Sequence, residues 1–245
     1  MSTTRPTSRS SENSAGSWIR RGIASSFGSR PGRHASLRSP ATLALFLAVG
    51  GPAVADPAAD FESLEARLST ASVVRLDFRA TAEGVVEADL SGRLEIGPMG
   101  HAQLIATGHF AGETVELRLA VANGRLTLDN GASKTEATRP AHLEEALVIG
   151  LTRMGILHNL ANLSGGAPPD HADGGVREWV VVEGLAEGGV AASVSFDLVV
   201  AGEPAGSAEL MLDARGRPSL RRQTVEFPSG QMRVVERYSA VTIEP

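Results

Sequence analysis

Five histidines that follow residue 55 are the first candidates for chemistry, because imidazole serves both as a metal ligand and as a general base. His101 and His109 are eight residues apart on a predicted strand, so their side chains share a face. At about 3.3 Å per residue they lie roughly 26 Å apart, too far to bind one metal ion. His142 lies at a predicted helix start, and His158 follows in the same helical region. The spacing of these four residues does not favour a metal site.

The fifth histidine, His171, lies between Asp170 and Asp173, and these residue types could hold a metal ion. The surrounding segment is rich in Gly, Pro and Asp, which favours a solvated loop instead. Ser164 precedes two glycines, but a nucleophile elbow needs glycine on both sides of the serine and a strand before it. We expect neither a metal nor a nucleophile in this segment.

Glu144 and Glu145 are adjacent on a predicted helix, so their carboxylates point about 100° apart and form a poor acid–base pair. They suit a first helical turn, where the helix dipole favours negative charge. The chain has no HExxH motif and no phosphate-binding glycine motif. It also has no cysteine, which excludes disulfides and thiolate chemistry. We therefore expect no enzymatic activity, no metal and no cofactor.

Residues 1–55 have the three parts of a secretory signal peptide. A long basic region comes first, a short apolar run from Ala41 to Val49 follows, and Ala53-Val54-Ala55 forms a small-residue cleavage site. The apolar run is too short to span a bilayer of about 30 Å, although an uncleaved anchor is the alternative. Cleavage after Ala55 predicts a periplasmic protein, exported by the general or the twin-arginine route.

Charge argues against nucleic acid as a partner. The chain carries 23 basic and 28 acidic residues, and removal of the seven Arg and one Glu of residues 1–55 leaves 16 and 27, a net charge of −11. Such a surface repels phosphate backbones and anionic lipid. We expect a monomer that neither binds nucleic acid nor inserts stably into a membrane.

The segment from Ala141 to Leu163 is the most apolar helical stretch after residue 55. One face carries apolar residues at helical spacing, namely Leu143, Leu147, Leu151 and Met154. Other apolar residues widen this stripe over most of the helix surface, which therefore needs apolar cover. Glycine is unfavourable inside helices by about 1 kcal/mol, so Gly155 predicts a bend or break that divides the segment in two.

Nearly all other segments alternate apolar and polar residues, the pattern of an antiparallel sheet with one apolar face. The predicted strands are 74–80, 86–96, 102–110, 115–121, 126–128, 176–183, 190–198, 208–214, 220–227 and 231–241. Asn123-Gly124 is a strong hairpin signal. We expect a short amphipathic helix over 56–72, and residues 132–140 form a predicted polar connection.

About ten strands and two helical regions predict an α+β fold, in which residues 56–245 form one domain. A large curved antiparallel sheet, forming an incomplete β-barrel whose mouth is covered by a helical lid, buries both the sheet face and the apolar helix. Inward positions are mainly Val, Leu and Ala, and small side chains leave volume for a ligand. An ordinary packed core with nothing inside explains the periodicity equally well.

The chain resembles the periplasmic outer-membrane lipoprotein carrier and lipoprotein-sorting superfamily, the LolA-like group. Four segments carry the resemblance: the first strand Ser72–Arg79 after a helix, the stretch Gly92-Arg-Leu-Glu-Ile-Gly-Pro98, the hairpin Val121–Asp129, and the last two strands within 220–241. The chain departs from the family at Ala80, where a Gln is common, and near Ala102 and Gln103, where an aromatic residue and an Arg are expected.

This resemblance implies a half-barrel with a helical lid over a hydrophobic cavity, and a soluble carrier of a hydrophobic small molecule, lipid, acyl chain or lipoprotein, with an envelope protein as a further partner. The alternative is a non-enzymatic envelope structural or interaction module with a filled core. The predicted cavity-lining residues are Leu76, Phe78, Leu90, Leu94, Leu104, Leu117, Leu147, Leu151, Met154 and Phe196.

Overall fold

The computed structural model describes residues 56–164, 176–190 and 192–245. The predicted signal peptide and the segment around His171 lie outside the described residues. Among the described residues, no helix is both long and apolar enough to cross a bilayer.

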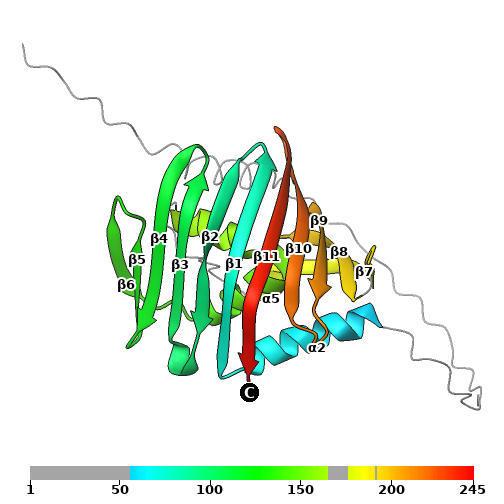
Figure 1. Ribbon diagram of the computed structural model, residues 1–245, viewed down its shortest axis with the longest axis horizontal. Helices are drawn as coiled ribbons and strands as arrows, with labels where there is room; N and C mark the ends of the chain where they lie inside the picture. Colours follow the sequence, from blue (N-terminus) through cyan, green and yellow to red (C-terminus); the bar gives the residue numbers. More distant parts are fainter. Residues whose placement is uncertain (1–55, 165–175, 191) are drawn as a thin grey trace, which may run out of the picture.

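The strands of the described residues form a single antiparallel sheet with the order β6-β5-β4-β3-β2-β1-β11-β10-β9-β8-β7. The strands are β1 Val73–Gly84, β2 Ala88–Ile96, β3 Ala102–Phe110, β4 Glu113–Ala122, β5 Arg125–Asp129, β6 Lys134–Thr138, β7 Val180–Glu187, β8 Ser193–Val200, β9 Glu203–Leu212, β10 Pro218–Phe227 and β11 Gly230–Glu244. Pairing of β1 with β11 joins two meanders, one from each half of the chain. The sheet is open, with β6 and β7 at its edges (Figure 1). The predicted large antiparallel sheet is confirmed.

Two predictions about strands are wrong. Residues 134–138 form the edge strand β6, where the sequence predicts only a polar connection. Because four of these five side chains are exposed, β6 has no apolar alternation to reveal it. The predicted strand from Val176 begins instead with a helical turn, α5 Val176–Trp179, and the strand β7 starts at Val180.

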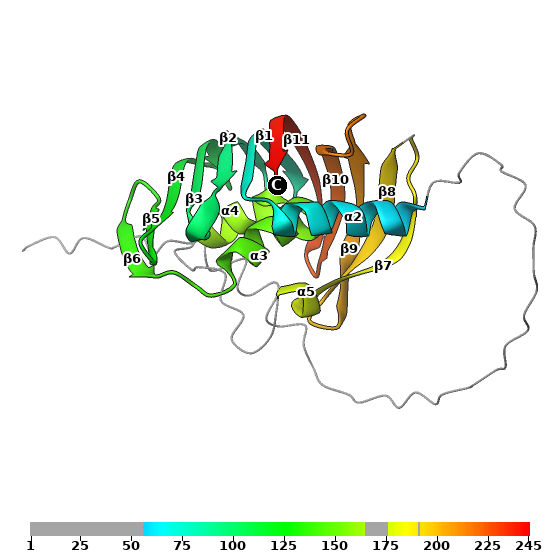
Figure 2. The same cartoon turned by 90° about the horizontal axis from the view of Figure 1, so that it is seen from below.

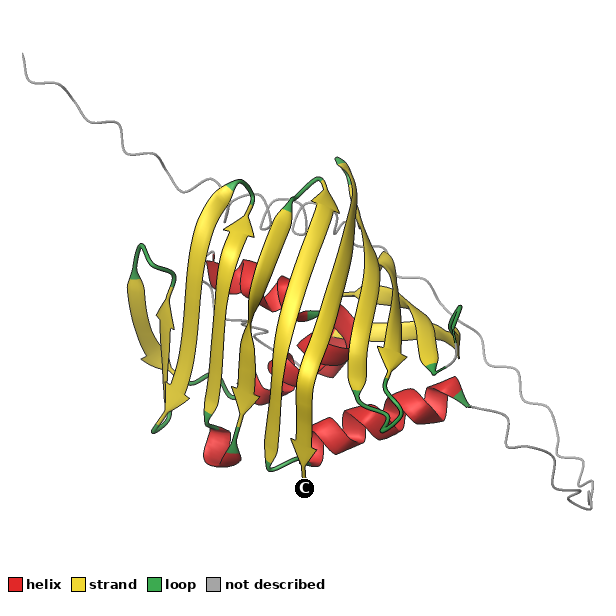
Figure 3. Ribbon diagram, viewed as in Figure 1, coloured by secondary structure: helices red, strands yellow, loops and turns green. Residues whose placement is uncertain are grey.

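The longer helices lie on one side of the sheet or along its edge (Figure 3). They are α2 Pro57–Thr70, α3 Leu143–Ile149, the π-helix η2 Gly150–Met154 and α4 Ile156–Ser164. A short 3-10 turn, η1 Pro98–Gly100, joins β2 to β3. Asp56 caps α2 by accepting hydrogen bonds from the amides of Ala58 and Ala59. In Figure 2 the sheet curves around α3 and α4, and Figure 1 shows α2 below the lower ends of the strands from β11 to β7.

The predicted break at Gly155 is confirmed. Gly155 has φ 84° and ψ 158°, a region that only glycine adopts readily, and it separates η2 from α4. The two pieces fold back closely, because a Cβ on Gly150 would lie 2.1 Å from the Asn159 side-chain nitrogen. Asn159 donates from this nitrogen to the carbonyl of Ala146 at 3.3 Å. The segment from α3 to α4 is therefore a helical hairpin rather than a rod.

A glycine on β2 allows an aromatic ring to lie flat against the sheet. Gly92 is opposite Phe78 of β1, and a Cβ on Gly92 would lie 2.7 Å from the Phe78 ring and 2.0 Å from the carbonyl oxygen of Ile105 on β3. The ring covers backbone that glycine leaves bare. The position of the Phe78 ring on the concave face thus depends on the lack of a side chain at Gly92 of the neighbouring strand.

We predict that Gly92→Ala destabilises the fold by about 1–3 kcal/mol, because the added methyl group forces β2 away from Phe78 and Ile105. Gly97→Ala is the matched control, since its Cβ would meet only ordinary contacts, 3.4 Å from the His101 ring. Urea denaturation of both variants measures the difference. Equal stability of the two variants would show that Gly92 makes no tight contact.

Candidate functional site

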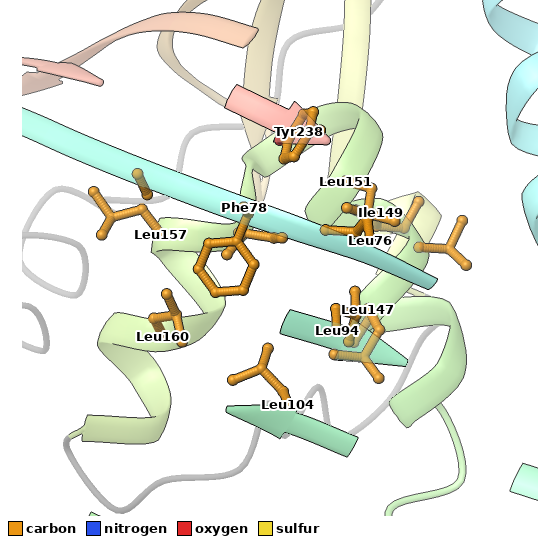
Figure 4. Packing of buried hydrophobic residues seen from close by; sticks show 14 of the residues in the cluster. Leu76, Phe78, Leu94, Leu104, Leu147, Ile149, Leu151, Leu157, Leu160 and Tyr238 are labelled. Atoms are coloured by element: carbon orange, nitrogen blue, oxygen red, sulfur yellow. The ribbon is translucent and has the colours of Figure 1, made fainter. Parts of the chain in front are cut away.

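The predicted cavity residues gather in one apolar cluster on the concave face. Figure 4 shows several of them between β1, β2, β3 and the helical hairpin. Met154 is partly buried and packs against the cluster, and the other nine are buried. Six are 0–1% exposed: Leu76, Leu90, Leu94, Leu104, Leu117 and Leu151. Because these six side chains are almost inaccessible to water, the space beside them is filled by protein in this conformation. Their role in ligand binding stays a prediction.

Helix α4 occupies the centre of the concave face. It contacts both β11 and β4, so it crosses the strands that lie between them, β1 to β3. In that region several inward positions are small: Ala80, Ala82, Ala88, Ala106 and Gly108. Among the described side chains of α4, the buried apolar ones are Ile156, Leu157 and Leu160, and Figure 4 shows the two leucines beside Phe78. The volume that small inward residues leave is thus taken by α4.

The N-terminus of α4 is held by a carboxylate from the sheet. Glu236 on β11 is 1% exposed and accepts hydrogen bonds from the amides of Ile156 at 2.9 Å and Leu157 at 2.8 Å. These amides have no partner inside the helix, and the helix dipole favours negative charge at this end. Tyr238, two residues along the same strand, donates its hydroxyl to Glu236. Glu236 is therefore the cap of a helix that begins eighty residues earlier in the chain.

A buried arginine holds the other side of the break. Arg221 on β10 is directly opposite Glu236 on β11 and is 1% exposed. It donates from Nη2 to the carbonyl of Arg153, at the end of η2, and to Gln223 Oε1 at 3.1 Å. A cation suits the C-terminal end of a helix as an anion suits the N-terminal end. One cross-strand pair of charges thus binds both helix ends that meet at Gly155.

Burial shifts the pKa values of two groups here in opposite senses. Desolvation, followed by the negative charge of Glu236, raises the pKa of Tyr238 well above its usual value of 10.0. Desolvation lowers the pKa of Arg221, while the charges of Glu236 and Tyr238 act against that change. Tyr238 therefore stays protonated and can donate, and the guanidinium remains a cation because its ordinary pKa is so high.

A second buried charge cluster fixes η2 to α2 and α5. Glu65 on α2 is 4% exposed and pairs side-on with Arg153, with Nε–Oε1 and Nη2–Oε2 distances of 2.7 Å each. Thr152 donates to Glu65 Oε1 at 2.9 Å, and Arg177 of α5 reaches Oε2 at 2.7 Å. Burial raises the pKa of Glu65, but the bonds and charges of Arg153, Thr152 and Arg177 outweigh it and leave the pKa below its usual value.

The sequence analysis missed all of these polar groups. One signal was present: Glu236 lies between Val234 and Tyr238 at spacing two, so it shares their inward face. An acidic residue at an inward strand position is unusual unless it is paired. Arg221 was harder to find, because Arg222 follows it and either could face inward.

The histidines do not assemble into a site within the described part of the chain. His101, His109 and His142 are exposed, and His158 lies with its ring centroid 6.4 Å from that of Trp179. Among the described residues, no group of three or more His, Asp or Glu side chains could hold a metal ion.

A surface cleft of about 480 Å³ lies away from the concave face, between the end of α2, the β9–β10 turn and the last strand. Two of the three arginines that line it, Arg67 and Arg217, have hydrogen-bond partners nearby. Arg217 bonds Asp213 at 2.8 Å and lowers the pKa of that carboxyl to about 2, and Arg67 donates to the carbonyls of Arg215 and Gly216. These contacts fasten α2 to the turn.

We predict that Gly155→Ala destabilises the protein more than Gly202→Ala. Both glycines have φ near +85°, so both variants carry backbone strain of about 1–3 kcal/mol. Only at Gly155 would the new Cβ also lie 2.6 Å from Glu236 Oε1, whereas nothing lies within 4 Å at Gly202. Thermal unfolding measures both variants, and equal losses would contradict the placement of Glu236 against the break.

We predict that Glu65→Gln lowers stability by about 3–5 kcal/mol, because it leaves the largely buried Arg153 without its anion, whereas Arg177 keeps Glu145 as a partner. Glu62→Gln, on the exposed face of the same helix, is the matched control and changes little. Denaturant unfolding gives both values.

The effect depends on pH. The folded-state pKa of Glu65 lies below its unfolded value of about 4.5, so its stabilisation is fully present above that value and is lost as pH falls through the folded-state pKa. The stability difference between the native chain and Glu65→Gln should therefore shrink at acid pH. A difference that stays constant as the pH falls below 4 would contradict a charged Glu65.

No protein-family model matches the sequence, and no curated protein matches it. Among solved structures, the chain is similar to the lipoprotein LppX of Mycobacterium tuberculosis, with 12% identity, 78% of this chain and 98% of that chain covered, and a TM-score of 0.35. LprF from Mycobacterium bovis has 10% identity, coverage of 77% and 96%, and a TM-score of 0.35. A LolA superfamily protein from Nitrosomonas europaea has 10% identity, coverage of 78% and 95%, and a TM-score of 0.31. The last of these structures carries the name of the LolA superfamily, the group that the sequence also resembles.

Proposed function

We propose that the protein is a periplasmic carrier that binds an apolar ligand, a lipid or acyl chain, on the concave face of its sheet. The observation that supports this proposal is the position of α4, which covers a stripe of small inward residues on β1, β2 and β3. In this account α4 occupies the ligand site in the unliganded protein and moves aside when a ligand enters. The predicted signal peptide supports the periplasmic location.

Beyond the first turn that Glu236 caps, exchange of α4 for an acyl chain costs little free energy. The helix is nine residues long, and isolated helices of this length are marginal in water, so its stability comes from packing on the sheet. An acyl chain would contact the same alanine and leucine side chains, and one apolar partner would replace another. Gly155 provides a joint at the N-terminal end of α4, where the chain can turn without moving η2.

The second candidate function is an envelope structural or interaction module with a filled core. The observation that favours it is the low exposure of the predicted cavity leucines, six of which, five on strands and Leu151 on η2, are 0–1% exposed. If α4 is a permanent part of the core, these side chains never meet a ligand. The two functions differ in one property, namely whether weakening the packing of α4 improves binding.

We predict that Leu160→Ala raises the affinity for a neutral fluorescent apolar probe, N-phenyl-1-naphthylamine, by about tenfold. Leu160 is 1% exposed on α4, and loss of a buried leucine side chain costs about 2–5 kcal/mol. Here the loss destabilises the conformation in which α4 packs on the sheet. A ligand whose competent state is rarely populated binds more tightly when that state becomes easier to reach. Probe titration of the full chain measures the change.

Leu64→Ala is the matched control, because Leu64 is equally buried but lies on α2. It should lower stability without raising affinity. Mass spectrometry of organic extracts from the purified protein gives an independent readout, and we expect co-purified acyl lipid. Empty extracts, together with no probe binding by the native chain or Leu160→Ala, would reject the carrier and favour the filled-core module.

A further inference from the structure

Arg221 differs from every other arginine of the described residues in how its side chain is placed. It is 1% exposed, it extends from β10 into the apolar interior, and its guanidinium carbon lies 5.7 Å from the centroid of the Phe196 ring. Nη2 is fully used, with one bond to the carbonyl of Arg153 and one to Gln223. Nε and Nη1 have no hydrogen-bond partner among the described residues. Three N–H hydrogens of a buried cation are therefore without an acceptor.

The charge of Arg221, in contrast, already has a counterpart. Glu236 is the cross-strand neighbour of Arg221 and is equally buried. Its oxygens accept from the amides of Ile156 and Leu157 and from the Tyr238 hydroxyl, and neither oxygen bonds Nε or Nη1 of Arg221. The Phe196 ring stabilises the cation but accepts hydrogen bonds only weakly. The site lacks acceptor oxygens rather than negative charge.

This distinction selects the ligand chemistry. A carboxylate or phosphate would bring a second anion beside Glu236 in a low-dielectric interior, which is unfavourable. An uncharged carbonyl oxygen would accept from Nε or Nη1 and leave the charge balance unchanged. An unsatisfied buried donor costs about 1–3 kcal/mol, so the gain from one such bond is substantial.

The position of Arg221 fits the polar end of an acyl ligand. Across the sheet, Arg221 is opposite Glu236, Glu236 is opposite Ala80, and Ala80 is opposite Leu90, so the inward row runs from Arg221 directly into the stripe of small residues beneath α4. We propose that Arg221 binds the ester carbonyl of an acylated ligand whose hydrocarbon chain replaces α4 on β1 to β3. This inference rests on the proposed carrier function and names the part of the ligand that the protein recognises.

The test compares three ligands of similar length in the full chain: methyl oleate, the hydrocarbon 1-octadecene and oleate at pH 8. Each competes for N-phenyl-1-naphthylamine. We expect methyl oleate to displace the probe at a concentration about tenfold lower than 1-octadecene, the ratio that one hydrogen bond to a charged donor provides. Oleate should be no better than methyl oleate.

Variants locate the effect. Arg221→Met should reduce the ratio between ester and hydrocarbon to about one, while Arg222→Met, the exposed neighbour on the outer face, should leave it unchanged. If Arg221→Met does not fold, Arg221→Lys keeps the charge with a different set of donors and should reduce the ratio. The infrared carbonyl stretch of ¹³C-labelled methyl oleate gives a direct readout, with a shift to lower frequency in the native chain that is absent in the variant.

The outcomes separate the two proposals. If no ligand displaces the probe, the carrier function fails, and the inference fails with it. If methyl oleate and 1-octadecene bind equally, the carrier stands and the Arg221 site is overturned, as expected if water alone meets its N–H groups. If oleate binds far more tightly than the ester and this preference is lost in Arg221→Met, the site is an anion site and the inference is overturned.

Discussion

The helical hairpin on the concave face depends on one pair of opposite charges, Arg221 and Glu236, which face each other across β10 and β11. Each meets a helix end of the sign that it favours: the cation donates to the carbonyl of Arg153 in the last turn of η2, and the anion accepts from the first amides of α4. Both side chains are buried, so each would be costly without its helix end and without the other. This mutual dependence fixes the break at Gly155 over one point of the sheet.

The two ends of the hairpin are held very differently. On the α3 side, η2 is anchored by the buried ion cluster of Glu65 with Arg153 and Arg177. On the α4 side, beyond its capped first turn, a hydrogen bond from Asn159 to Ala146 and a ring contact of His158 with Trp179 accompany the packing of apolar side chains on the strands. A segment with a rigid half and a half held mainly by apolar packing is the arrangement that a replaceable cover needs. The same arrangement is compatible with a filled core, so binding experiments decide between them.

Strand alternation in the sequence predicted most of the sheet, because an antiparallel sheet with one buried face has an apolar side chain at every second residue of each strand. Gly155 likewise predicted the break. The exposed edge strand β6 left no such pattern. The π-helix and the Arg221–Glu236 pair could not be predicted, because both depend on which strands become neighbours and in which register. Whether the apolar helix is a lid or a core element is also invisible to periodicity, since both are buried.

The small inward residues of the sheet connect the volume expected from the sequence with the position of α4 in the structure. The sequence indicates spare volume beside small inward side chains in general, and in the structure the inward residues Ala80, Ala82 and Ala106 are fully or almost fully buried. The volume is therefore real but occupied, and α4 crosses the strands that carry these residues. A cavity need not be visible in such a protein, because the ligand and the helix would share one space at different times.

The central claim, that α4 occupies the place of the ligand, is tested most directly by amide hydrogen exchange with and without saturating methyl oleate. If the claim is correct, the amides of α4 beyond its capped first turn exchange faster in the liganded protein, while those of Ile156 and Leu157, which donate to Glu236, and those of β1 and β2 remain protected. Unchanged or slower exchange throughout α4 in a protein that has bound the ligand would contradict it.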